Sequence, residues 1–437
     1  GSSNGNLYGA YGRFYTHIAV CNDFIRNVRS GIFELDSELR PVADQFVLEA
    51  RALRDLSYFY VIDFFGNAVR AWDDMPYGET PQQTTRAELF KLVTEDLEDV
   101  LANYKESGVY GRVGKDGIEA LLCRYYLNAE VFTGTPMYDK CWEHAQNIIA
   151  RHKGSGFQNS GLANDYLALF AFNNDMFMPG GSLKDQNEIL WGVPFAYPYT
   201  QSYGGTMFLI AAATSASSMP TVLYGLSADW SCMHAREQFA DKFDFRGGIS
   251  SDKRTYLWCT EQQGFTKAND EFSDFKSGYA PIKFTNAKAE ADGTMPRNTY
   301  KDPGTGYTFN WAGVGEVNGL PAQTNDFADT DFPVIRLADV YLMAAECALR
   351  GAGDMATGLQ YVNTVRARAG VSAWNTAEYT LNNILDERSR ELYWENVRRT
   401  DLVRFGKFAG GSYNWAWKNN VRNGGAMPEY MNLFPIP

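Results

Sequence analysis

The side chains most often used for metal binding and nucleophilic catalysis are sparse in this sequence. The four histidines, His17, His144, His152 and His234, are not paired at a zinc-binding spacing such as H-E-x-x-H. Gly1-x-Ser3-x-Gly5 matches the pattern of a nucleophilic serine by letter, without the strand, turn and helix that such a serine requires. No glycine-rich phosphate-binding loop occurs. The motifs therefore give no support to a zinc enzyme, a serine hydrolase or a nucleotide-binding protein, and we predict no cofactor.

Acidic side chains offer two further kinds of site. Segment 325–331 gathers oxygen ligands that could hold calcium, but it lacks the glycine and terminal glutamate of an EF-hand loop. We interpret it as a solvated acidic loop and predict no metal. A glycoside hydrolase needs two carboxylates about 5 to 10 Å apart, and a chain with 52 acidic residues could contain such a pair. No local pattern nominates one.

The charged run 386–399 could be mistaken for an acid/base centre. Asp386 lies four residues before Arg390, and Glu395 lies three and four residues before Arg398 and Arg399. Side chains at these spacings face each other on a helix and form ion pairs. We therefore expect a structural role for the run.

Six cysteines are present, none of them in a C-x-x-C pair. Most lie in apolar helical patterns, where buried free thiols are expected. Cys232 and Cys259 both lie in a loop-rich region, and an exported protein could form a disulfide between them.

Composition sets the class of protein. The 437 residues are 45% hydrophobic and 21% charged, so the chain can bury a large core as one big domain or two tight ones. The formal net charge of −12 repels polyanions, so we predict no nucleic-acid partner. The apolar run 208–213 is far shorter than the roughly 20 residues of a membrane-spanning helix.

Helical periodicity dominates both ends of the chain. Residues 41–65 carry apolar stripes on two sides and end at Phe65-Gly66, which predicts a helix packed on two faces. Thr85 and Glu88 form a capping box for a helix over 85–104. Further helices are expected at 11–29 and 380–399.

Two segments, 118–151 and 337–369, read as helical hairpins of similar length and pattern. This pattern resembles a tetratricopeptide repeat, in which hairpins bury their faces by stacking on their neighbours. The fold class we predict is mainly α, with a tetratricopeptide-like helical-repeat scaffold and a large irregular insertion.

Residues 156–331 have a different texture, because they hold eight of the 16 prolines and eighteen of the 40 glycines. We predict a variable loop-rich insertion there, between N-terminal helical repeats at 1–155 and a C-terminal repeat and closing segment at 332–437. Together the three parts would make one domain, 1–437.

Several motifs stand out from about residue 45 onward: 50–66 with its closing Phe-Gly turn, Asp244-Phe245-Arg246, Lys283-Phe284, 332–348, 363–370, 387–406 and the closing 433–437. In type and order these motifs resemble those of the SusD/RagB family of outer-membrane glycan-binding lipoproteins. Because Arg336, Asp339 and Glu346 lie among apolar neighbours, we expect them to be packing and ion-pair positions.

The resemblance implies a tetratricopeptide-like scaffold that supports variable loops, and a protein without catalytic activity. Such a protein captures an oligosaccharide or polysaccharide at the cell surface and delivers it to a TonB-dependent, SusC-like transporter. It also implies a signal peptide and a lipidated cysteine upstream of Gly1.

The resemblance places glycan contacts in the loop after the first Phe-Gly turn and in loops of the insertion. Sugar binding needs flat aromatic faces beside groups that hydrogen-bond hydroxyls. The predicted contacts are Trp72, Asp73, Asp74, Tyr77, Tyr307, Asn310, Trp311 and Trp258, with Trp230 as a further candidate. We expect the Trp72 and Trp311 loops to meet as one exposed aromatic platform, although for any one of these rings core packing is an equal alternative.

Two other functions remain open at this point. An all-helical glycoside hydrolase would turn over a labelled oligosaccharide. A helical-repeat adaptor would bind a protein partner and no sugar.

Overall fold

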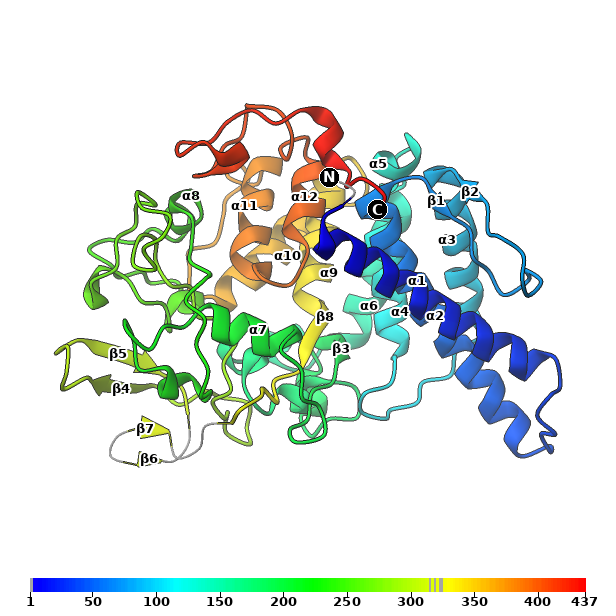
Figure 1. Ribbon diagram of the computed structural model, residues 1–437, viewed down its shortest axis with the longest axis horizontal. Helices are drawn as coiled ribbons and strands as arrows, with labels where there is room; N and C mark the ends of the chain where they lie inside the picture. The colour runs from blue at the N-terminus through cyan, green and yellow to red at the C-terminus, as the bar shows by residue number, and fades with distance from the viewer. Residues whose placement is uncertain (1–2, 314–315, 318–319, 322–324) are drawn as a thin grey trace.

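The computed structural model describes residues 3–313, 316–317, 320–321 and 325–437 (Figure 1). Helices from both ends of the chain lie together, and the irregular segments between them gather at the opposite side. Within the described residues, no helix combines the length and the apolar character that crossing a bilayer would need.

The N-terminal part is a long helical hairpin followed by a third helix. It consists of α1 (Gly5–Arg29), α2 (Leu39–Phe65), the short strands β1 (Ala68–Val69) and β2 (Gln83–Thr84), and α3 (Arg86–Asn103). Thr85 and Glu88 form the expected capping box. Gly66 ends α2 with φ +74°, and a Cβ there would lie 2.9 Å from Leu433, so only glycine fits both demands. The helices predicted at 41–65 and 85–104 are confirmed.

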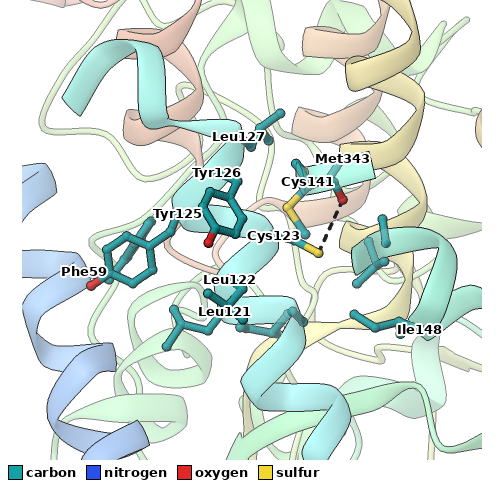
Figure 2. Packing of buried hydrophobic residues seen from close by; sticks show 14 of the residues in the cluster. Phe59, Leu121, Leu122, Cys123, Tyr125, Tyr126, Leu127, Cys141, Ile148 and Met343 are labelled. Carbon is teal, nitrogen blue, oxygen red and sulfur yellow. Dashed lines mark hydrogen bonds between the residues drawn. The ribbon is translucent and has the colours of Figure 1, made fainter. Parts of the chain in front are cut away.

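Two further hairpins complete the scaffold. The first is α4 (Lys115–Leu127), α5 (Ala129–Thr133) and α6 (Tyr138–His152), and the second is α9 (Leu337–Leu349) with α10 (Met355–Arg368). Figure 2 shows how α4 turns Leu121, Leu122 and Tyr125 into the core, with Phe59 of α2 on one side and Met343 of α9 on another. Hairpins far apart in sequence therefore share one core, as the repeat pattern predicted.

The helix predicted over 380–399 is two helices, α11 (Leu381–Leu392) and α12 (Arg398–Arg404). Between them Trp394 and Asn396 adopt left-handed backbone conformations, each with φ of 62°. The expected pairs of Glu395 with Arg398 and Arg399 are therefore wrong. Asp386 and Arg390 both lie in α11, but they do not pair with each other, because Arg390 binds Glu387. The actual partners of the two acidic residues come from elsewhere: Glu395 binds Lys283 and Arg336, while Asp386 binds Lys242.

Residues 156–331 are irregular, as predicted, and have a second core of their own. The regular elements are β3 (Ile189–Val193), α7 (Gly205–Ala212), α8 (Glu237–Ala240), β4 (Asn298–Lys301), β5 (Thr308–Trp311), β6 (Glu316–Val317) and β7 (Leu320–Pro321). Strand β8 (Phe332–Arg336) follows and pairs antiparallel with β3, so Val193 lies opposite Phe332. This pairing crosses the boundary at 331, and the division at 155 and 331 stays a prediction.

Short 3-10 helices punctuate the irregular parts of the chain. They are Phe157–Asn159, Leu167–Phe170, Asn174–Phe177, Lys184–Gln186, Thr221–Tyr224, Asp241–Phe243, Lys253–Thr255, Glu261–Gln263, Lys418–Asn420 and Glu429–Asn432.

All six cysteines are free thiols. Cys259 is buried beside the Tyr224 hydroxyl, whereas Cys232 is exposed, so the disulfide that an exported protein could have formed between them is not present.

A buried ion-pair network joins the insertion to the C-terminal helices. It consists of Glu188, Arg254, Lys283, Arg336, Arg368, Glu387, Glu391 and Glu395. Burial alone would raise the pKa of Glu391, but its three arginine partners outweigh burial and hold that pKa at about 2. The structural role expected of the charged run is confirmed for Glu387, Glu391 and Glu395, and Arg336 is the ion-pair position that was expected. Asp339 and Glu346 are likewise buried against arginines.

Candidate functional site

Trp72, the first predicted glycan contact, is a core residue. It follows β1, and its side chain is only 7% exposed. The Arg54 guanidinium lies 3.5 Å from the ring centroid and covers one face, while Tyr58 packs at 5.6 Å between ring centroids. No flat face is left for a sugar ring, and the expectation that Trp72 is exposed is wrong.

The two acidic residues that follow Trp72 form ion pairs with arginines. Asp73 binds Arg54 at 2.5 Å and also pairs with Arg29. Asp74 binds Arg70 at 2.6 Å on the surface.

Tyr77 is the exposed member of this loop. Its hydroxyl donates to Asp23 at 2.7 Å, and Arg26 lies 4.7 Å from its ring centroid. The loop therefore offers one open ring beside carboxylates that are already paired.

The second predicted group lies on the β4–β5 hairpin. Trp311 is 3% exposed and packs edge-on against Tyr300. The Asn310 side-chain amide donates to the backbone carbonyl of Tyr256 at 3.2 Å, and Lys276 lies 5.6 Å from the Tyr307 ring centroid. Asn310 and Tyr307 are partly exposed, whereas the expectation that Trp311 is exposed is wrong.

Trp258 is also a core residue. It is packed among Phe239, Phe243 and Phe245, and its indole N–H donates to the Tyr393 hydroxyl at 3.2 Å. The ring is packed against other aromatic side chains and its N–H group has a hydrogen-bond acceptor, as is usual for a tryptophan in a core.

The two predicted loops do not meet. Trp72 belongs to the core of the helical scaffold and Trp311 to the core of the insertion. Figure 1 shows β1 and β5 at opposite ends of the molecule. The single platform expected from the sequence is therefore not formed.

The structure gathers exposed rings at a different place, around Trp230. We call Tyr197, Tyr203, Phe208, Trp230 and Phe327 the aromatic surface cluster. Tyr203 is central, with ring centroids 5.1 Å from Phe327 and 6.4 Å from Trp230, and Phe208 lies 5.8 Å from Trp230. Tyr203 is 68% exposed. Trp230, a further candidate from the sequence, is partly buried against the insertion core and connects to the exposed rings Tyr203 and Phe208.

The loop that carries Tyr197 and Tyr203 is held in place by two carboxylates. Asp331 accepts hydrogen bonds from the Phe195 N–H and the Tyr110 hydroxyl, both at 2.7 Å, and Asp329 accepts one from the Tyr197 N–H at 2.6 Å. Burial raises the pKa of Asp331 to about 7. The solvated acidic loop expected at 325–331 is thus wrong for Asp331, which is buried and serves as a loop anchor.

Polar side chains accompany the rings. The Ser227 hydroxyl donates a hydrogen bond to the Asp326 carboxylate at 3.0 Å, next to Phe327. The exposed Gln201 lies two residues before Tyr203. Such groups can hydrogen-bond sugar hydroxyls beside a stacked ring. Across the described residues, no group of three or more histidine, cysteine or acidic side chains is placed to hold a metal ion.

Sequence reasoning missed Tyr197, Tyr203, Phe208 and Phe327. A signal was present in segment 194–204, where four aromatic residues alternate with proline, glycine and small polar residues. That composition is typical of a loop that cannot bury all its rings.

The comparisons with known proteins agree with this architecture. The model of the SusD family matches residues 233–433. The starch-binding protein SusD of Bacteroides thetaiotaomicron is 31% identical over 407 residues, which span 89% of this chain and 69% of that protein. The chain belongs to the SusD family.

Two other similarities extend this result. SusD-like protein P25 of Formosa agariphila is 32% identical over 411 residues, covering 89% of this chain and 69% of that protein. The structure of surface glycan-binding protein A from Bacteroides thetaiotaomicron, in complex with laminarihexaose, aligns with a TM-score of 0.63 at 22% identity. The alignment covers 98% of this chain and 82% of that one. The tetratricopeptide-like helical fold expected for a SusD family member is confirmed.

Proposed function

We propose that this SusD family protein is a cell-surface glycan-binding protein that captures an oligosaccharide or polysaccharide and delivers it to a TonB-dependent, SusC-like transporter of the outer membrane. Two relatives are named for binding starch and for a complex with laminarihexaose, which supports a glycan as the ligand here. The transporter and a lipid anchor are proposed from the family alone.

The aromatic surface cluster is the observation that carries this proposal. Tyr197, Tyr203 and Phe208 are exposed, Trp230 and Phe327 are partly buried beside them, and burying aromatic surface against a sugar ring is favourable at little entropic cost. The loop beneath them is fixed by Asp329 and Asp331, so the platform is ordered before the ligand arrives. We propose Tyr203 and Trp230 as the central stacking residues.

The exposed residues predicted from the sequence are proposed as additional glycan contacts outside the aromatic surface cluster. Tyr77, Tyr307 and Asn310 offer accessible groups away from the cluster and stay predicted contacts of a long polysaccharide. For Trp72, Trp258 and Trp311 we propose that their effect on binding is indirect, through the stability of the loops they support.

The proposal is tested by titrating starch, laminarin and xyloglucan oligosaccharides into the purified protein. Tyr203→Ala should weaken binding of the preferred glycan about tenfold or more, which corresponds to roughly 1.4 kcal/mol, while the melting temperature stays close to that of the wild type. Tyr8→Ala is the matched control, because Tyr8 is 71% exposed on α1, outside the cluster. Equal loss in both variants, or no binding of any glycan by the wild type, would refute the proposal.

We also propose that the protein has no catalytic activity. The acidic residues in contact with the cluster loop accept backbone hydrogen bonds, which assigns them a structural task. Incubation with labelled oligosaccharides should return them uncut. Turnover would favour an all-helical glycoside hydrolase, whereas a stable transporter complex without glycan binding would favour an adaptor.

A further inference from the structure

A second candidate site lies in a cavity of about 380 Å³ between the C-terminal helices and the insertion. It is bordered by α11, α12, the segment that enters α8, and the tail after α12. None of its lining residues belongs to the aromatic surface cluster. The volume is at the lower end of the range for small-molecule sites, roughly 300 to 1,000 Å³.

The cavity wall carries five cationic side chains, Arg236, Lys242, Arg388, Arg398 and Arg399, and a single carboxylate, Asp401. We call this space the arginine cavity.

Three of these cations are neutralised within the protein. Arg388 binds Asp339 at 2.8 Å and Asp401 at 2.9 Å. Lys242 binds Asp386 at 2.5 Å. Arg399 lies 3.3 Å from Asp63.

The other two arginines have no carboxylate partner among the described residues. Arg398 donates to the Leu385 carbonyl at 2.8 Å and to the Tyr413 hydroxyl at 2.6 Å, both neutral acceptors. Arg236 makes no side-chain hydrogen bond in the described part of the chain, and its Nη1 is buried without a partner. Burial also lowers the pKa of Arg236, which reflects the cost of holding its charge there. A partly buried charge of this kind is stabilised when an anion binds beside it.

The remaining wall is largely apolar, with aliphatic side chains such as Leu392 and Leu402 beside a group of aromatic rings. Tyr413 and Trp415 lie 6.4 Å apart between ring centroids, Phe408 lies 6.2 Å from Trp415, and Trp394 lines the same space. Trp394 holds a left-handed backbone conformation at φ 62°, which is costly for a bulky residue, and such strain clusters at functional sites. Asn414 adds an exposed amide at the cavity edge.

We propose that the arginine cavity binds an acidic sugar, with its ring against the aromatic wall and its anionic group between Arg236 and Arg398. Guanidinium groups pair with carboxylates and with sulfate or phosphate esters in the same forked geometry. The shared chemistry is therefore one oxyanion carried on a sugar ring, supplied either by a uronic acid or by a sulfated sugar. This site does not depend on the aromatic surface cluster, so it can exist whether or not that cluster binds glycan.

The first experiment titrates D-glucuronate, glucose 6-sulfate, D-glucose and acetate into the wild-type protein by calorimetry. We expect glucuronate or glucose 6-sulfate to bind at least tenfold more tightly than glucose and acetate. A preference for glucuronate identifies a uronic acid as the source, and a preference for the sulfate identifies a sulfated sugar. Equal binding of glucose, equal binding of acetate or no binding overturns the proposal.

Variants locate the bound anion. Arg236→Gln and Arg398→Gln should each weaken binding of the acidic sugar at least tenfold. Arg236→Gln should also keep or raise the melting temperature, because it removes an uncompensated charge. Arg246→Gln is the matched control, since it makes the same charge change on an exposed side chain and should leave binding within about twofold.

A measurement on the wild type guards against variants that fail to fold. The Trp415 indole signal in a ¹H–¹⁵N spectrum, assigned with Trp415→Phe, should shift on addition of the acidic sugar. The Tyr203→Ala protein should bind that sugar as the wild type does. Loss of binding in Tyr203→Ala, or an unmoved Trp415 signal, would place the anion elsewhere and overturn the inference.

Discussion

The helical scaffold and the insertion both bury charged and aromatic side chains, but the insertion also leaves a group of aromatic rings at its surface. In the scaffold, the ring of the buried Trp72 lies against the Arg54 guanidinium. Charged side chains of the scaffold motifs form buried ion pairs such as Arg388–Asp339. In the insertion, Tyr203 and its neighbours remain at the surface on a loop fixed by Asp331. Most of the recognisable motifs of this family therefore maintain the fold, with the exposed pair Asp244 and Arg246 as an exception, and we propose that ligand contact falls to segments without a fixed motif.

The largest expected effect tests the buried side of this comparison. Glu391→Gln leaves Arg254, Arg336 and Arg368 without a common counter-charge. Removing one partner from a buried ion-pair network costs about 3 to 5 kcal/mol, so the free energy of unfolding should fall by that order.

The effect is read from chemical denaturation, with Glu143→Gln as the control on an exposed position of α6. Glycan affinity of the folded fraction should stay within about twofold. A variant as stable as the wild type would show that the network is not needed for stability.

The next effect compares two aromatic residues directly. Trp72→Ala should lower the free energy of unfolding by about 3 kcal/mol or more, because it leaves a cavity beneath Arg54. Tyr203→Ala should change stability by less than about 1 kcal/mol, since its ring is 68% exposed.

Thermal and chemical denaturation of the two variants side by side measure the contrast. The comparison between regions breaks down if Trp72→Ala weakens glycan binding without a loss of stability.

The smallest expected effect concerns the anchor of the aromatic loop. The pKa of Asp331 is raised to about 7 by burial, from an ordinary value near 4. The folded protein therefore binds a proton that the unfolded chain releases between about pH 4 and pH 7. The stability that this proton contributes is fully present below about pH 4 and is lost as the pH rises through 7.

Asp331→Asn should remove this component. Between pH 5 and pH 8, the melting temperature of the wild type should fall relative to that of Asp331→Asn by roughly 1 to 3 °C. Melting curves at both pH values give the result, with Asp326→Asn as the exposed control in the same segment. A difference that is constant with pH would contradict the assignment.

The sequence predicts the scaffold well because its signals are local. The capping box at Thr85 and Glu88, the glycine that ends α2, and the two hairpins are each written within a short stretch of chain. The break between α11 and α12 was missed because it depends on left-handed residues, Trp394 and Asn396, that no local pattern demands.

The candidate site was harder to predict for a related reason. The sequence around a tryptophan followed by two aspartates is the same whether the ring is buried or exposed, and the residue that covers Trp72 is Arg54 on another element. The aromatic surface cluster joins residues 197 and 327, and only the folded chain brings them together. The high proline and glycine content identified residues 156–331 as loop-rich, but only the folded structure shows which aromatic rings of that segment are accessible.

The pairing of β3 with β8 has a consequence for how this protein could be changed. Val193 and Phe332 lie opposite each other, so the chain leaves the scaffold and returns to it at nearly the same point. Segments whose ends lie close together can be exchanged between proteins without reshaping their host. A graft between these two residues would have to supply cations in place of Lys242, Arg254 and Lys283. Otherwise their partners in and beside α11 would lose these ion pairs: Asp386, Glu387, Glu391 and Glu395. With those pairs kept, we expect the segment to act as an exchangeable cassette for ligand preference on a constant frame.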